Sequence, residues 1–125
     1  MTFVTDNFAL ILYVTGGMTL AGWLALVAPD LVWSQVMGRG PRDTAERMAV
    51  RTLGACIGMD GVLLIWAAGT VEYRPPVLAF AIACKGLFAI MAFANMKEIK
   101  TRVLVNLAVA DSVMVILYGL YLLGF

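Results

Sequence analysis

Four long apolar runs constrain the fold of this chain most strongly. They lie within residues 8–28, 43–70, 76–95 and 102–123, and only short polar segments separate them. A helix that crosses a bilayer needs about 20 mostly apolar residues, so each run is long enough for one crossing. With 62% hydrophobic and 14% charged residues, the chain is too apolar for a soluble domain of its size. The sequence therefore predicts an all-α integral membrane protein, in which residues 1–125 form a single bundle of four transmembrane helices.

The segment between the first two runs has a structure of its own. The stretch PDLVWSQVMG, which begins at Pro29, predicts a short interfacial helix whose apolar side chains, Trp33 among them, lie against lipid. The GRGP stretch at 38–41 then interrupts it. Asp43 at the N-cap and Glu46 three residues later predict the start of the second long helix, which enters the membrane near Ala49. A tight turn at Pro75 and Pro76 is expected before the third helix.

The distribution of Lys and Arg predicts an orientation. The segment between the first and second runs carries four of them, the segment between the third and fourth carries three, and the middle turn carries one (Arg39, Arg42, Arg47 and Arg51; Lys97, Lys100 and Arg102; Arg74). The positive-inside rule places the two basic segments in the cytoplasm and both termini on the other side. Five aromatic residues are expected to form an interfacial belt on that non-cytoplasmic side: Tyr13, Trp66, Tyr73, Tyr118 and Tyr121.

Three ionisable residues lie near the middle of three different apolar runs: Asp60, Lys85 and Asp111. Counted from the basic ends of their helices at about 1.5 Å per residue, all three lie about 15 Å deep, half of a ~30 Å hydrocarbon core. The first helix adds Thr15 and Thr19 at a similar depth. These residues are predicted to form a polar layer at the membrane midplane, with two acids and one base.

The unequal charge of this layer leaves two interpretations open. One acid can pair with Lys85, and the other must then find a second partner, take up a proton or face water. In a structural interpretation, the ion pair fixes which helices are neighbours and the spare acid is protonated. In a functional interpretation, the layer binds a proton or a ligand. Because close acids titrate together, the sequence does not assign the proton to Asp60 or to Asp111.

A stripe of glycines on the second helix predicts close helix packing. Gly54, Gly58 and Gly61 lie on one face, about 120° away from Asp60, and small residues let the backbone of another helix approach closely. The Gly16–Gly17 pair offers a similar surface on the first helix. The partner helix could belong to the same chain or to another one.

Several kinds of site are excluded by composition or spacing. The chain has no histidine for a haem or an imidazole–metal site, no cysteine pair at redox or zinc spacing, and no glycine-rich phosphate loop. Cys56 and Cys84 are interpreted as small buried apolar residues. No catalytic residue and no metal site is identified, and the cofactor is unknown. A formal net charge of +1 gives no reason to expect nucleic acid as a partner.

Three functional hypotheses follow. The first is an accessory or assembly subunit that binds other transmembrane helices, in a hetero-complex or a homo-oligomer, since the short loops leave little outside the bilayer. The second is an oligomeric proton- or ion-coupled carrier or channel that uses the Asp/Lys/Asp layer for transport. The third is a lipid-binding protein or a membrane enzyme, with a midplane acid as catalyst. An enzyme is the less favoured interpretation, and the lipid bilayer is an expected partner in all three.

Overall fold

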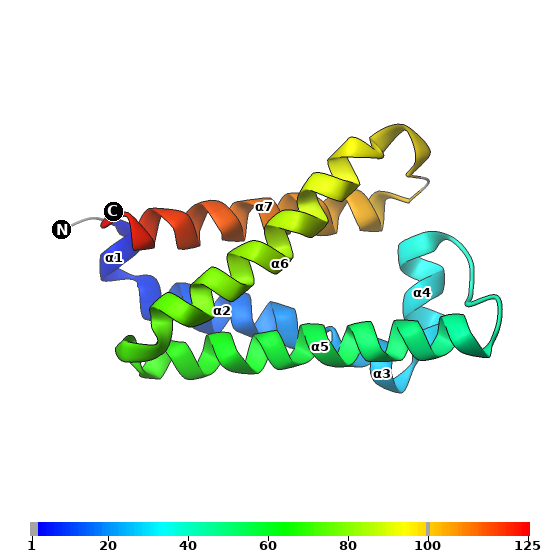
Figure 1. The fold of residues 1–125 in the computed structure, drawn as a ribbon, viewed down its shortest axis with the longest axis horizontal. Helices are drawn as coiled ribbons and strands as arrows, with labels where there is room; N and C mark the ends of the chain where they lie inside the picture. Colours follow the sequence, from blue (N-terminus) through cyan, green and yellow to red (C-terminus); the bar gives the residue numbers. More distant parts are fainter. Residues whose placement is uncertain (1–2, 100) are drawn as a thin grey trace.

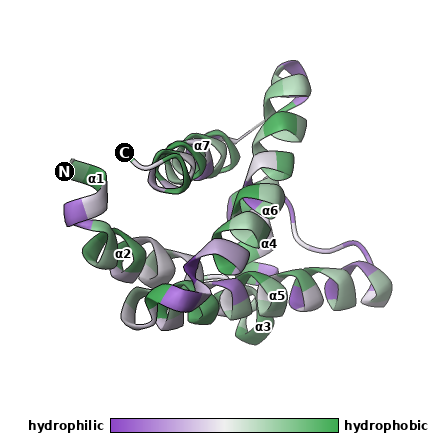
Figure 2. Cartoon of the chain, turned by 60° about the vertical axis from the view of Figure 1, so that its left-hand side comes forward, coloured by the Kyte–Doolittle hydropathy of each residue, from purple (hydrophilic) through white to green (hydrophobic). Residues whose placement is uncertain are grey.

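The computed structural model describes residues 3–99 and 101–125, and all regular structure in these ranges is helical. Four segments are long and apolar enough to cross a membrane: Phe8–Val27, Thr44–Gly69, Val71–Ala94 and Arg102–Leu122. Figure 2 shows hydrophobic residues along most of their length, while hydrophilic residues gather at the end of α5 (Thr44–Gly69) that follows the α4–α5 loop. The all-helical plan with four membrane-length helices is therefore confirmed.

The first membrane-length segment is not one continuous helix. It consists of α2 (Phe8–Leu20) and α3 (Trp23–Val27), and a short helix, α1 (Phe3–Asp6), precedes it. At the interruption, the amides of Ala21 and Gly22 donate to carbonyls only three residues back, at 3.2 and 3.0 Å. Such tight turns have 3₁₀ geometry, in which the backbone stays hydrogen-bonded while the direction of the helix changes. The span Phe8–Val27 thus matches the predicted run 8–28 closely, although the sequence did not indicate the interruption at residues 21–22.

The short helix between the first two spans is present as α4 (Pro29–Met37). It ends at Gly38, whose φ of 78° is a left-handed conformation that glycine adopts without steric cost. The predicted N-cap of α5 is also confirmed: the Asp43 side chain accepts the Glu46 amide hydrogen at 2.7 Å. The α4–α5 loop therefore joins two helices whose ends match the sequence signals.

The second half of the chain follows the predicted pattern with small shifts. A 3₁₀ turn, η1 (Val71–Tyr73), leads into α6 (Arg74–Ala94), and a second one, η2 (Met96–Glu98), precedes α7 (Arg102–Leu122). The helix α6 begins two residues before the predicted 76, because both prolines fit into its first turn, where a missing N–H breaks no helical bond.

The four spans form two pairs that join at one end and separate at the other (Figure 1). α2 and α3 lie along α5, and α6 crosses from α5 to α7. The helix α1 and the C-terminal end of α7 lie at the same end of the bundle as the α5–α6 turn, and the Thr5 amide donates to the Phe125 carbonyl oxygen at 3.4 Å; we call this the terminal end. The opposite, basic end holds α4, the loop at 38–43 and the α6–α7 connection. There the Thr101 hydroxyl donates to the Val36 carbonyl oxygen.

The buried core fills the terminal half of the bundle. It takes residues from all four spans: Phe8, Leu12, Leu64, Ala67, Ala68, Val77, Leu78, Ala81, Met114 and Tyr118. Arg74 lies beside it, buried, and its guanidinium donates to the carbonyl oxygens of Ala67 and Ala68 at 3.0 and 2.9 Å. These are last-turn carbonyls of α5, some of which have no partner within the helix. Arg74 thereby joins the ends of α5 and α6 and closes the terminal end.

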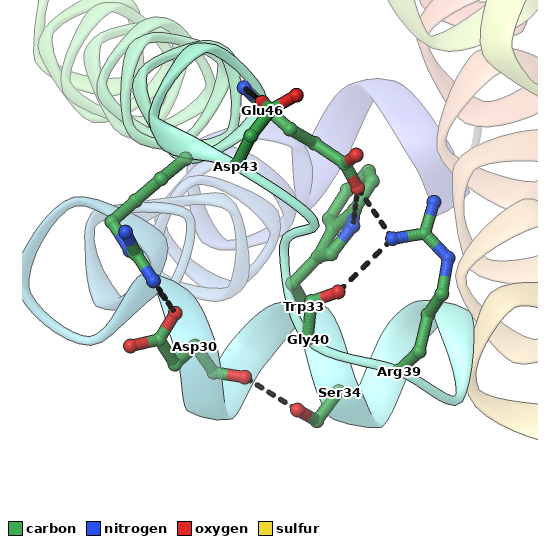
Figure 3. Close-up of polar contacts among 8 residues, drawn as sticks. Asp30, Trp33, Ser34, Arg39, Gly40, Asp43 and Glu46 are labelled. Atoms are coloured by element: carbon green, nitrogen blue, oxygen red, sulfur yellow. Dashed lines mark hydrogen bonds and ion pairs between the residues drawn. The ribbon is translucent and has the colours of Figure 1, made fainter.

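A polar cluster at the basic end links α4 to the start of α5 (Figure 3). The Glu46 carboxylate accepts hydrogen bonds from the Trp33 indole at 2.8 Å and from the Arg39 guanidinium at 2.6 Å. Arg47 and Asp30 form a second ion pair, at 3.1 Å. The Trp33 indole N–H thus donates to a carboxylate. The sequence indicated only that Trp33 lies against lipid and did not predict this contact. The cluster fixes how α4 sits against α5.

Candidate functional site

Lys85 on α6 is the centre of the polar layer. Its side chain is buried, and its Nζ donates to Asp111 Oδ1 on α7 at 3.3 Å and to Thr19 Oγ1 on α2 at 3.1 Å. Burial of an ammonium group is costly unless partners of this kind surround it. The helices α2, α6 and α7 therefore meet through one cation.

Asp60 on α5 is the second acid of the layer, and it differs from Asp111 in its surroundings. Only 6% of Asp60 is exposed, and its Oδ1 has no hydrogen-bond partner among the described residues. Lys85 directs its hydrogen bonds to Asp111 and Thr19 rather than to Asp60. A buried carboxylate oxygen without a donor is unfavourable, so Asp60 is the member of the layer that lacks a partner.

Thr15 lies one helical turn from Thr19, toward the terminal end, and belongs to a neighbouring set of contacts. Its Oγ1 accepts the hydroxyl hydrogen of Tyr118 at 2.6 Å and donates to the Ile11 carbonyl oxygen at 2.8 Å. Thr19 in turn donates to the Thr15 carbonyl oxygen at 2.7 Å. The structure therefore places both predicted threonines in one buried polar region, but only Thr19 contacts Lys85.

Tyr118 is fully buried, so its assignment to an interfacial aromatic belt was wrong. Its ring packs edge-on against Phe8, with centroids 6.2 Å apart, and its hydroxyl is bound by Thr15. A signal for this position exists in the sequence: Tyr118 follows Asp111 by seven residues, which places both on one face of α7. Tyr13, Trp66 and Tyr73, by contrast, are exposed.

The glycine stripe of α5 faces α2 and α3 of the same chain. A Cβ added to Gly61 would lie 2.7 Å from the Leu20 nitrogen and 2.8 Å from the Gly16 carbonyl oxygen. At Gly54 it would lie 2.6 Å from the Gly22 carbonyl oxygen, and at Gly58 it would overlap the Trp23 ring. The helices can approach so closely only because these side chains are absent.

Gly17, the second residue of the Gly16–Gly17 pair, lies outside this contact. A Cβ added to Gly17 would meet no atom within 4 Å, whereas one added to Gly16 would come within 2.8 Å of Ile65. Gly16 therefore packs against α5, and Gly17 does not contact another helix of the described chain.

A groove of about 880 Å³ opens between the two helix pairs at the basic end. Its walls come from α4, α5, α6, α7 and the α6–α7 connection, and most of them are apolar: Val36, Met37, Leu53, Leu87, Phe88, Met91, Ala92, Ile99 and Leu104. Leu53 precedes Asp60 by seven residues, and Leu104 precedes Asp111 by seven, so these wall residues lie on the helix faces that carry the acids. The groove therefore lies along the same helix faces as the polar layer, but Asp60, Lys85 and Asp111 do not line it.

Cys84 marks the deep end of the groove, directly before Lys85 in α6. Cys84 and Cys56 are both free thiols with exposed surface, so the interpretation of these residues as buried was wrong. The pattern of a long apolar run did not reveal the groove, because α5 and α6 separate toward the basic end and uncover this part of α6.

The chemistry of the layer is limited to charge and hydrogen bonding. In the residues that the structure describes, no group of three or more histidine, cysteine or acidic side chains is arranged to hold a metal ion. The layer supplies one unpaired carboxylate, one ion pair and three hydroxyl groups, those of Thr15, Thr19 and Tyr118. Such groups can bind a proton, a small cation or an ammonium group, and they can pass a proton between them.

Comparison of the chain with protein-family models, with curated proteins and with solved structures finds no match.

Proposed function

We propose that this protein is a small membrane carrier in which Asp60 binds and releases a proton, while the groove admits the transported ligand. The observation that carries this proposal is the buried Asp60 Oδ1 without a hydrogen-bond partner, beside a lysine that is bound to Asp111 and Thr19. A proton on Asp60 removes the unpaired charge, and its loss returns that charge to the layer.

The shape of the bundle supports a carrier over a purely structural ion pair. An ion pair that only held the helices together would need the Lys85–Asp111 contact and no open space beside it. Here the core closes the terminal half, and an open groove extends from the basic end to Cys84, the neighbour of Lys85. An occupant of the groove that reaches Cys84 would lie one residue along α6 from Lys85, and through the charge of Lys85 it could be coupled to the proton on Asp60, as a carrier requires.

Asp60→Asn tests the proton site. We expect the infrared band of a protonated carboxylic acid in the purified wild-type protein, and we expect this band to vanish in Asp60→Asn but to persist in Asp111→Asn. In liposomes with a trapped pH-sensitive dye, a pH gradient should drive proton entry through the wild type, and Asp60→Asn should reduce it to the background of empty liposomes. Asp6→Asn is the matched control, since Asp6 is an exposed acid of α1. A wild-type rate of proton entry in Asp60→Asn would refute the proposal.

The proposed orientation places the basic end, and with it the mouth of the groove, in the cytoplasm. Its support is the excess of Lys and Arg at this end, seven residues against Arg74 alone at the terminal end. Arg74 is moreover bound to helix carbonyls and Tyr121. New cysteines at Thr2 and Phe125, in a background without Cys56 and Cys84, should react with an impermeant reagent in intact cells, and one at Arg42 should not. The reverse pattern would reject this orientation.

Assembly with helices of other chains is the second candidate function. One specific observation favours it: a shallow groove of about 280 Å³ lies between α6 and α7, lined by Gly86, Ala89, Ile90, Phe93, Ser112, Val115 and Ile116. A helix of a second chain could approach closely over Gly86, because the nearest atom to an added Cβ there is 4.0 Å away. The glycine stripe of α5 does not support it, since α2 and α3 already cover that face. The mass of the native complex after mild extraction separates a monomer from an assembly.

A further inference from the structure

The groove at the basic end combines an apolar interior with a charged rim. Its interior walls carry leucine, methionine and phenylalanine side chains, several of them exposed, such as Leu53, Leu87 and Met91. Its rim carries Arg39, Arg42, Asn95, Glu98 and Thr101. A ligand that matches both parts must itself be amphipathic, with an apolar chain and a polar head.

The charge of the rim decides which head fits. Among the described residues, the basic end holds six basic side chains against four acidic ones, Asp30, Asp43, Glu46 and Glu98. Glu46 is already paired with Arg39 and Asp30 with Arg47, and Asp43 caps α5. Among the described residues, Arg42 has no ion-pair partner although it lines the groove. Glu98 opposes it in part, but the surplus at this end is positive.

The length of the groove suits a single chain. Along α6 its lining extends from Asn95 at the rim to Cys84 at the deep end, eleven residues apart. At about 1.5 Å per residue this is roughly 16 Å along the helix axis, about half of a hydrocarbon core of ~30 Å. An extended acyl chain anchored at the rim would therefore reach the neighbourhood of the polar layer.

We propose that the groove binds a single-chain anionic amphiphile, with its carboxylate or phosphate head at Arg42 and its chain directed toward Cys84. This inference rests on the proposed carrier function, for which it names the class of ligand. A cationic amphiphile would have to place its head among the basic side chains of the rim, or carry it to Asp60 at the far end of the apolar walls. The positive rim favours the anion.

The two native cysteines provide a test with a built-in control. In the Cys56→Ser variant only Cys84, inside the groove, can react with a maleimide, and in Cys84→Ser only Cys56, which does not line the groove, can react. In phosphatidylcholine nanodiscs, palmitate should slow the labelling of Cys84 by about tenfold and leave Cys56 unaffected. Hexadecyltrimethylammonium, a cation with a chain of the same length, should protect Cys84 much less.

Arg42→Gln should raise the palmitate concentration needed for half-protection by about tenfold, the effect of one lost charge-assisted contact. Lys97→Gln, an exposed cation at the same end that does not line the groove, is the matched control and should leave it unchanged. Native mass spectrometry gives a second measurement: a palmitate adduct on the wild type that weakens in Arg42→Gln.

Three results would overturn the inference. Equal or better protection by the quaternary ammonium would assign the groove to cations. Retention of a phospholipid of the nanodisc on the protein, with no effect of palmitate, would assign the groove to a two-chain lipid. If palmitate neither protects Cys84 nor forms an adduct, the groove does not bind single-chain anionic amphiphiles. If palmitate does not bind but the proton signal from Asp60 is present, the proposed carrier function stands and only the ligand class is wrong. If palmitate binds but the proton signal from Asp60 is absent, the protein binds the amphiphile without the proposed proton-coupled function.

Discussion

Lys85→Met should be the most damaging single substitution in the polar layer and should lower the free energy of unfolding by about 3–5 kcal/mol, the usual cost of removing one partner from a buried ion pair. The methionine would leave Asp111 and Asp60 in an apolar layer without a cation, and Thr19 without its donor. Protonation of the acids limits the loss but restores no contact. Removal of either acid alone should cost less, because Lys85 keeps at least one oxygen partner. Thermal unfolding in detergent measures the effect, and Lys97→Met, at an exposed lysine, is the control.

A triple variant separates the structural role of the layer from its functional one. Asp60→Asn, Lys85→Met and Asp111→Asn together remove every charge and should recover much of the stability that Lys85→Met loses. The same protein should show no proton entry above that of empty liposomes. Proton entry at the wild-type rate in this variant would mean that the layer is only a lock between helices. A single Lys85→Met protein as stable as the wild type would contradict the buried ion pair itself.

The sequence was sufficient to predict the helical plan of the chain. Runs of apolar residues locate all four spans to within about two residues at most ends, because the length requirement of the bilayer is strict. The capping signal of Asp43 and the glycine at 38 also fall where the structure ends and begins its helices. These features are local, so the residues that produce them lie next to one another in the sequence.

The contacts between helices were less accessible from the sequence. Depth counting brought Asp60, Lys85 and Asp111 into one layer, but it could not show which acid Lys85 binds, since this depends on the crossing of α6 between α5 and α7. The same crossing buries Tyr118 and exposes Cys84. In a transmembrane helix the lipid-facing and protein-facing sides are both apolar, so hydrophobicity alone does not reveal a groove.

The glycine stripe illustrates how the structure sharpens a sequence prediction. Regular spacing indicated that Gly54, Gly58 and Gly61 form a packing face, without indicating whether the partner belongs to the same chain. In the structure α2 and α3 cover this face, and the surroundings differ between positions. Gly58 faces the side chain of Trp23, which can move, whereas Gly61 faces backbone atoms, which cannot move without shifting a helix.

Gly61→Ala should therefore destabilise the bundle more than Gly58→Ala, by about 1–3 kcal/mol, as expected for one extra methyl group in a tightly packed site. The added Cβ would lie 2.7 Å from the Leu20 nitrogen and 2.8 Å from the Gly16 carbonyl oxygen, so α2 must move away from α5. Gly17→Ala is the matched control on the facing helix; it meets no atom within 4 Å and should be neutral or slightly stabilising. Thermal unfolding in detergent should rank Gly17→Ala above Gly58→Ala and Gly58→Ala above Gly61→Ala, and a Gly61→Ala protein as stable as the Gly17→Ala control would show that α2 and α5 do not pack along this stripe.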